Sequence, residues 1–208
     1  MSEFSKPQVG NVVFDMGGVL MVFDGMILAR NFTDNEQDAQ ALNQAFFSNP
    51  SWPLLDAGVI SEQTMERMAA VRLPERLWPN LHECLLHWHE HKPVIAETNE
   101  LVRRLHEAGY GCYVLSNAGF RFWREKDYIP CFKYMDGWVV SAFEHIMKPD
   151  PRIYQTLCER YALDPATCVF VDDNPDNVRG AEVAGMKGYY FEGAAGLEQH
   201  LKGLGLKF

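Results

Sequence analysis

The sequence predicts an α/β fold in which a parallel sheet carries helices on both faces and a small helical cap follows the first strand. Short apolar runs alternate with helical patterns along most of the chain, which is typical of a parallel sheet covered on both faces. Polar side chains stand directly after several of these runs. One helix-patterned segment interrupts the alternation after the first run. Together these features indicate a Rossmann-like core with one insertion.

Short apolar runs are the predicted strands of this sheet. A run of this length between turn residues and helical patterns is consistent with a strand that is buried on both faces. In chain order, the predicted strands lie at 12–14, 112–115, 137–140, 168–171 and 188–191.

Three helices of the predicted core have recognisable ends. We expect Thr98 to cap the N-terminus of the first helix, which Gly109 ends. Asp150 and Pro151 provide the cap and the first-turn proline of the second helix. The third helix opens with a proline and closes with a glycine, over 175–185. Each helix follows or precedes a predicted strand, as a parallel sheet requires.

The segment 24–95 departs from this alternation. It is patterned for helices, shows no clear strand, and contains Trp52, Trp78 and Trp88. We interpret it as a helical cap domain that covers the strand ends, with the tryptophans packing in its core or stacking on a sugar ring. The predicted core domain then consists of residues 1–23 and 96–208.

Composition limits the possible partners and the compartment. The chain of 208 residues is 47% hydrophobic, enough for one sizeable core and a small satellite domain. A net charge of −9 without a basic tract argues against nucleic acid as a partner. The opening residues MSEFSKPQVG lack the basic and apolar regions of a signal peptide. No apolar run is long enough for a membrane span. The five cysteines show no metal-binding spacing and suggest reduced thiols. We expect a soluble, cytoplasmic protein.

Polar residues at the ends of the predicted strands form the candidate site. Asp15 follows the first strand, Ser116 and Asn117 follow the second, and Asp172 and Asp173 follow the fourth. Ligands of open α/β sheets bind at the carboxyl ends of the strands. We therefore expect these five side chains to converge on one edge of the sheet.

The residue types at this edge point to phosphoryl transfer. A carboxylate at position 15 can attack phosphorus and form an aspartyl-phosphate. Two further carboxylates, Asp172 and Asp173, would repel Asp15 unless a cation lay among them, and Mg²⁺ suits an all-oxygen site. Ser116 and Asn117 can donate hydrogen bonds to phosphate oxygens.

Lys148 is the candidate source of fixed positive charge. It precedes Pro149 and the capped helix, so it lies outside any helix. A lysine there would offset the negative charge of the nucleophile and the phosphate, and such electrostatic stabilisation dominates phosphoryl transfer.

Four motifs resemble those of the haloacid dehalogenase-like hydrolases over nearly the whole chain. They are FDMGGVL at 14–20, VLSNAG at 114–119, MKPDPRIY at 147–154 and VFVDDNPDNVRGA at 169–181. The resemblance implies a Mg²⁺-dependent phosphatase that acts on a small phosphorylated metabolite through an aspartyl-phosphate on Asp15. It also implies that the metal is held by Asp15, the Gly17 carbonyl and Asp173, with Asp172 beside the metal or sharing it.

The first motif departs from the usual phosphatase pattern at Gly17. Most phosphatases of the family carry at this position an Asp that protonates the leaving oxygen and later activates water. Losing a general acid–base typically costs about 10²–10⁴ in rate, so we expect slow dephosphorylation with a product burst, and faster turnover in Gly17→Asp. The chain resembles a subgroup with a D-x-G motif that includes bacterial glucose-1-phosphate phosphatases. We therefore expect a preference for phosphates that leave easily, such as sugar 1-phosphates.

Two other functions remain open from the sequence. A haloacid dehalogenase also uses an Asp nucleophile but needs no metal, which leaves Asp172 and Asp173 without a purpose. A catalytically weak, ligand-binding scaffold is consistent with Gly17 but does not explain why Asp15, Lys148 and Asp173 are present.

Overall fold

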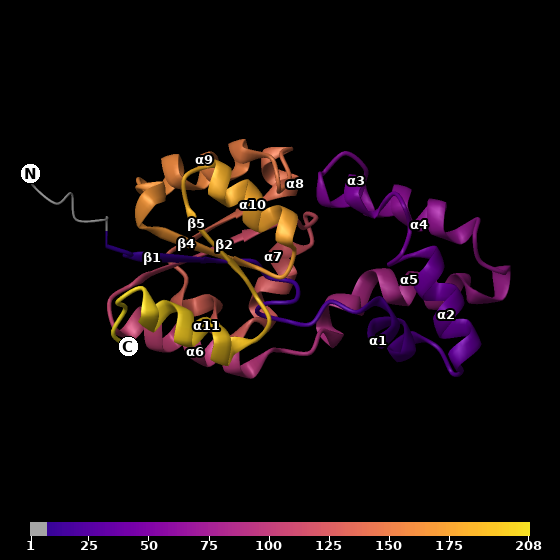
Figure 1. Ribbon diagram of the computed structural model, residues 1–208. Coiled ribbons are helices and arrows are strands. Elements are labelled where there is room, and N and C mark those ends of the chain that lie inside the picture. The colour runs from indigo at the N-terminus through magenta and orange to yellow at the C-terminus, as the bar shows by residue number, and fades with distance from the viewer. Residues whose placement is uncertain (1–7) are drawn as a thin grey trace, which may run out of the picture.

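Five parallel strands form the centre of the computed structural model, which describes residues 8–208 (Figure 1). They are β1 (Asn11–Phe14), β2 (Gly111–Ser116), β3 (Gly137–Val140), β4 (Cys168–Asp172) and β5 (Lys187–Tyr190), in the order β3-β2-β1-β4-β5. The predicted α/β fold with its parallel sheet is confirmed. Residues 1–7 lie outside the described part of the chain. They belong to the segment MSEFSKPQVG, which we interpreted as lacking a signal peptide.

Helices cover both faces of the sheet. In Figure 1, α6 (Ala96–Glu107) and α11 (Ala194–Gly203) lie below the sheet, and α9 (Pro151–Tyr161) and α10 (Pro175–Val183) lie above it. Successive side chains of a strand point to opposite faces, so Val12 and Phe14 pack in the core cluster of α6 and α11, whereas Val13 packs in that of α9. The described chain contains no helix with the length and apolar character of a membrane span.

Two details of the helices differ from the sequence prediction. Thr98 is fully buried inside α6 and does not cap it; the residue at the N-cap is Ile95. The start is set by the chain returning from the cap, where the Ile95 amide donates to the Leu20 carbonyl at 3.0 Å. Helix α11 was not predicted because Gly193 precedes it without a side-chain cap.

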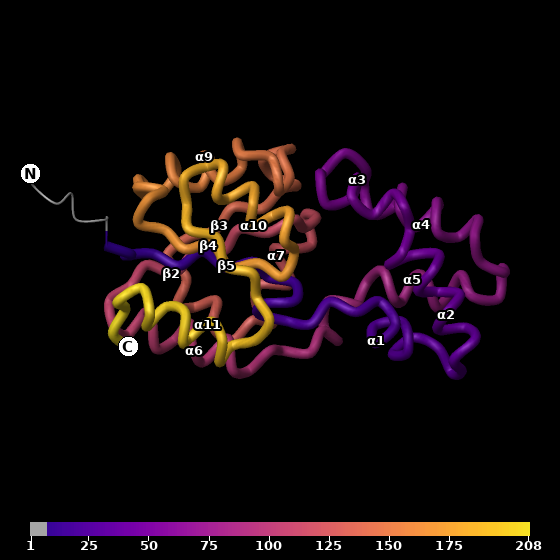
Figure 2. Tube along the Cα trace, viewed as in Figure 1, coloured from indigo at the N-terminus to yellow at the C-terminus, as the bar shows by residue number. Residues whose placement is uncertain are grey.

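The segment predicted as a cap is helical. It contains α1 (Gly25–Ala29), α2 (Glu36–Ala45), α3 (Trp52–Asp56), α4 (Glu62–Ala70) and α5 (Trp78–His87). These helices share an apolar cluster of their own, with Leu42, Phe46 and Met65 fully buried, and they lie beside the core at the end where β1 stops (Figures 1 and 2). The exact domain boundaries, 1–23 and 96–208 against 24–95, remain a prediction.

Short helices complete the described chain. Two α-helical turns follow β2 and β3, namely α7 (Phe122–Glu125) and α8 (Ser141–Glu144). Short 3-10 helices lie at Arg30–Phe32, Glu75–Leu77, Trp88–His91, Lys126–Tyr128, Pro130–Tyr134 and Pro165–Thr167. All five cysteines are buried free thiols, in agreement with the expected reduced state.

Candidate active site

The strand order brings Asp15 and Asp172 side by side. Strand β1 pairs with β4 in the register Phe14 to Val171, and the sequence of connections reverses between these two strands, which is where open α/β sheets bind ligands. The Asp15 amide continues the pairing by donating to the Val171 carbonyl at 2.9 Å. The two carboxylates therefore leave the sheet at neighbouring positions.

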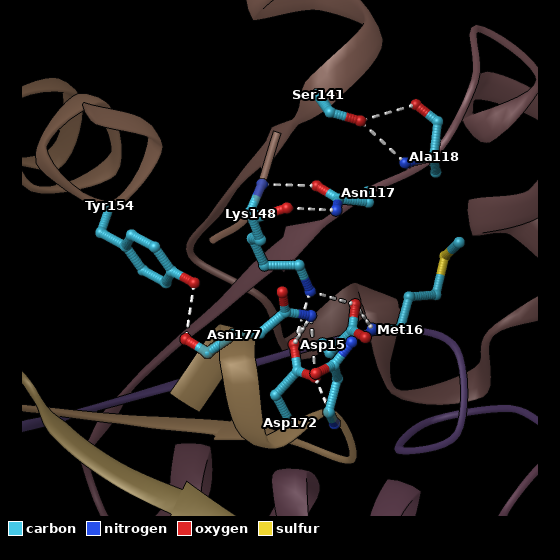
Figure 3. A network of polar contacts seen from close by, with 10 residues as sticks. Asp15, Met16, Asn117, Ala118, Ser141, Lys148, Tyr154, Asp172 and Asn177 are labelled. Atoms are coloured by element: carbon cyan, nitrogen blue, oxygen red, sulfur yellow. Dashed lines mark hydrogen bonds and ion pairs between the residues drawn. The ribbon is translucent and has the colours of Figure 1, made fainter. Parts of the chain in front are cut away.

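Asp15 is buried and held by donors. Its Oδ1 accepts a hydrogen bond from the Met16 amide at 2.7 Å and lies 2.8 Å from Lys148 Nζ (Figure 3). Burial raises the pKa of Asp15 to about 6; the positive charge of Lys148 opposes this shift and the charge of Asp172 adds to it. Both contacts use one oxygen, which leaves Oδ2 as the candidate nucleophilic atom.

Lys148 bridges the two buried carboxylates. Its Nζ lies 2.8 Å from Asp15 Oδ1 and 2.7 Å from Asp172 Oδ2, and the side chain is almost fully buried. Burial alone would lower the pKa of Lys148, but the two carboxylates outweigh it and the net shift is upward. The lysine is therefore a permanent positive charge at this edge of the sheet.

Asn117 holds Lys148 through its backbone. The Asn117 side chain donates from Nδ2 to the Lys148 backbone carbonyl at 2.9 Å, and its Oδ1 accepts from the Lys148 backbone amide at 2.8 Å (Figure 3). The sequence suggested that Asn117 and Ser116 donate to phosphate; both line the cavity, but the side chain of Asn117 is engaged with Lys148. Ser116 is the remaining side-chain donor of the pair.

Asp172 has partners at both carboxylate oxygens. Its Oδ1 accepts from the Asn174 amide at 2.8 Å, Oδ2 faces Lys148, and Asn177 Nδ2 lies 3.1 Å from each oxygen. Asn177 lies in the first turn of α10. In the fold it orients Asp172, a role that its position in the sequence does not reveal.

Asp173 is the carboxylate with the most freedom to bind a metal. Carboxylate oxygens of Asp15, Asp172 and Asp173 lie within 4.8 Å of one another. Burial and the charge of Asp172 raise the pKa of Asp173, which is the effect expected where acidic groups crowd together. Gly18, with φ of +74°, makes room for this side chain, because a Cβ there would collide with the Asp173 carboxylate. An all-oxygen donor set of this kind fits Mg²⁺.

Core and cap enclose a cavity of about 370 Å³ above these residues. The core contributes polar groups, including Asp15, Ser116 and Asp173, and the backbone around Gly17. The segment 23–92 contributes mainly aromatic and acidic side chains, namely Phe23, Trp52, Asp56, Glu62 and Trp88, together with Lys92. Trp52 and Trp88 thus both pack against each other and line the cavity, whereas Trp78 lies outside it.

A model of the haloacid dehalogenase-like hydrolases matches residues 9–185, which include every element of this site. The chain belongs to the haloacid dehalogenase-like hydrolase family. The resemblance of the four motifs is therefore confirmed at the level of the family.

Two curated relatives of this hydrolase are similar over most of the chain. A sesquiterpene phosphatase of Aspergillus oryzae is 26% identical over 187 residues, covering 86% of this chain and 87% of that protein. Flavin mononucleotide hydrolase 1 of Arabidopsis thaliana is 25% identical over 155 residues, 74% of this chain. The match covers 62% of the Arabidopsis protein, so the hydrolase spans less than two thirds of that relative's length.

A solved structure shares the fold of the hydrolase. It is a HAD family enzyme of Bacteroides thetaiotaomicron in complex with magnesium and inorganic phosphate, 20% identical, with a TM-score of 0.70 over 89% of this chain and 95% of that one. At this identity the comparison concerns the fold alone.

Proposed function

We propose that this hydrolase is a Mg²⁺-dependent phosphatase that acts on small phosphate monoesters through an aspartyl-phosphate on Asp15. The observation that carries the proposal is the buried Lys148, bonded to Asp15 and Asp172 at 2.8 and 2.7 Å beneath a cavity of small-molecule size. The curated relatives named as a phosphatase and a flavin mononucleotide hydrolase support phosphate esters as the substrate class.

The proposed metal site uses the oxygens at the cavity floor. Asp15, the Gly17 carbonyl and Asp173 would hold Mg²⁺, as the family pattern implies, and Asp172 would stay with its own partners Lys148 and Asn177. A bound Mg²⁺ supplies charge that offsets the dianionic phosphate. A Bacteroides enzyme with the same fold is in complex with magnesium and inorganic phosphate, which supports Mg²⁺ as the proposed ion.

The proposed reaction consists of two successive displacements at phosphorus, in which the residues of the site have different roles. Asp15 Oδ2 attacks phosphorus and the bond to the leaving oxygen breaks; water next attacks the phosphorus of the aspartyl-phosphate and frees the Asp15 carboxylate. Lys148 and the Ser116 hydroxyl stabilise the charge on the phosphoryl oxygens. Asn117 keeps Lys148 in place through its two backbone hydrogen bonds.

We further propose sugar phosphates, and sugar 1-phosphates in particular, as the preferred esters. Gly17 offers no acid to protonate a poor leaving group, and a hemiacetal oxygen leaves more easily than a simple alcohol. The cavity wall suits a sugar, because Trp52 and Trp88 can pack on its apolar face while the Glu62 carboxylate can accept hydrogen bonds from hydroxyls.

Assays of p-nitrophenyl phosphate, sugar 1-phosphates and simple alkyl phosphates test both parts of the proposal. With Mg²⁺, we expect turnover that falls in the order aryl, sugar 1-phosphate, alkyl; with EDTA, we expect a loss of about 10²-fold or more. Measured kcat/KM for each ester gives the order. Equal rates on sugar 1-phosphates and alkyl phosphates would contradict the substrate preference.

The same assays separate the other candidate functions. Release of halide from 2-haloacids without any metal requirement would identify a dehalogenase instead. Binding of phosphate esters without turnover, in the presence of Mg²⁺, would identify a scaffold and would contradict the phosphatase.

A further inference from the structure

A carboxyl group from the cap region lies in the same cavity as Asp15 and Gly17. Asp56 is the last residue of α3 and is half-buried. Asp56 joins Asp15, Gly17 and Ser116 among the residues that line the cavity. No sequence pattern selects Asp56, because it lies far from all four motifs.

The end of α3 is fastened to the core at the carboxyl edge of the sheet. Ser141, directly after β3, donates from Oγ to the Asp56 carbonyl at 2.6 Å and accepts from the Ala118 amide at 3.0 Å. Gly58, with φ of +67°, packs so closely that a Cβ there would lie 2.5 Å from the Ala142 carbonyl. Helix α3 accordingly lies beside α8 (Figure 1). The backbone of Asp56 is thus held over the loops that follow β2 and β3.

The surroundings of Asp56 favour a carboxyl group that carries a proton near neutral pH. Burial raises the pKa of Asp56 to about 7, and the charges of Glu125 on α7 and Asp15 add to this rise. The positive charge of Lys92 opposes it. The Lys92 ammonium is itself bonded to Glu125 at 3.0 Å, so its charge is shared with another carboxylate.

We propose that Asp56 is a general acid–base of this hydrolase and takes over part of the task for which position 17 has no side chain, so that poor leaving groups still react more slowly than good ones. The proposal rests on the proposed phosphatase function. As Asp15 Oδ2 bonds to phosphorus and the ester bond breaks, the leaving oxygen takes the proton of the Asp56 carboxyl group. The Asp56 carboxylate then takes a proton from water as the water oxygen bonds to phosphorus and the bond to Asp15 breaks. Both carboxyl groups return to their starting states.

Asp56→Asn tests this role through its dependence on the leaving group. We expect kcat/KM for an alkyl phosphate to fall by about 10²-fold or more, and that for p-nitrophenyl phosphate by less than about 10-fold, because nitrophenolate leaves without a proton. The second displacement should also slow, so a product burst in rapid mixing should be larger in Asp56→Asn than in the wild type. If Asp56 had a purely structural role, its replacement would lower kcat/KM for all esters by the same factor.

Two further variants control the experiment. Asp24→Asn removes an acid that caps α1 outside the cavity and should leave both rates unchanged, since Asn caps helices equally well. Gly17→Asp in the Asp56→Asn background should restore alkyl phosphate turnover by at least about 10-fold, since a Cβ at position 17 meets only Phe23 Cβ at 3.6 Å.

The outcomes distinguish this inference from the proposed function. Normal wild-type turnover with an equal loss, or no loss, on all leaving groups in Asp56→Asn would overturn the role of Asp56 and leave the phosphatase intact. Absence of turnover in the wild type on every ester would contradict the phosphatase itself, and the role of Asp56 with it.

Discussion

Asp15→Asn is expected to abolish phosphatase turnover, lowering kcat by about 10⁴-fold or more. The amide keeps the size of the side chain but cannot form the acyl phosphate, and the neighbouring oxygens belong to carboxylates that are bonded elsewhere or placed for the metal. Steady-state assays with p-nitrophenyl phosphate and Mg²⁺ measure the loss.

The stability of Asp15→Asn provides its control. Because burial raises the pKa of Asp15 to about 6, the ionised carboxylate costs free energy in the folded state above that pH, and a neutral amide avoids this cost. In EDTA at pH 7.5, the variant should therefore unfold at a Tm no lower than that of the wild type. Retained turnover in a folded variant would contradict the covalent mechanism.

Lys148→Met is expected to damage both stability and catalysis. It leaves the buried carboxylates of Asp15 and Asp172 without their shared cation, and breaking a buried ion pair by removing one partner costs about 3–5 kcal/mol. The free energy of unfolding, measured in urea with EDTA, should fall by that amount. With Mg²⁺ the protein should regain part of its stability, but kcat should stay about 10³-fold below the wild type because a phosphoryl-binding charge is missing.

Lys202→Met is the matched control for this variant. Lys202 forms an exposed pair with Glu198 at 2.6 Å, and such surface pairs contribute little to stability. Both its unfolding free energy and its kcat should remain near those of the wild type. A Lys148→Met protein as stable and active as Lys202→Met would show that the buried bridge is not needed.

The parts of the site that the sequence predicts are those fixed by strand ends. Asp15 and Asp172 meet because their strands are neighbours in register, and Ser116 is the last residue of β2 on the other side of β1. Residues whose roles depend on packing were not predictable in this way. The side chain of Asn117 contacts a backbone 31 residues away, and Asp56 reaches the cavity only because α3 docks on the core.

The same distinction applies to the fold. The mostly buried strands β1 to β4 were predicted well because a buried parallel strand is a short apolar run. The partly exposed β5 begins and ends one residue earlier than predicted. Thr98 has the chemistry of a cap but lies inside α6, because the chain returning from the cap pairs with Leu20 and starts the helix earlier. Helix α11 begins without a polar cap, so its start gave no local signal.

Trapping the phosphoryl group on Asp15 tests the covalent mechanism most directly. Wild-type protein is mixed with p-nitrophenyl phosphate and Mg²⁺ and quenched in acid within the first turnover. The protein is then digested, and the peptide masses are measured by mass spectrometry. We expect the peptide that contains Asp15 to gain the mass of one phosphoryl group, most strongly in Asp56→Asn. Product release within that turnover, with the Asp15 peptide unmodified in both proteins, would contradict the account.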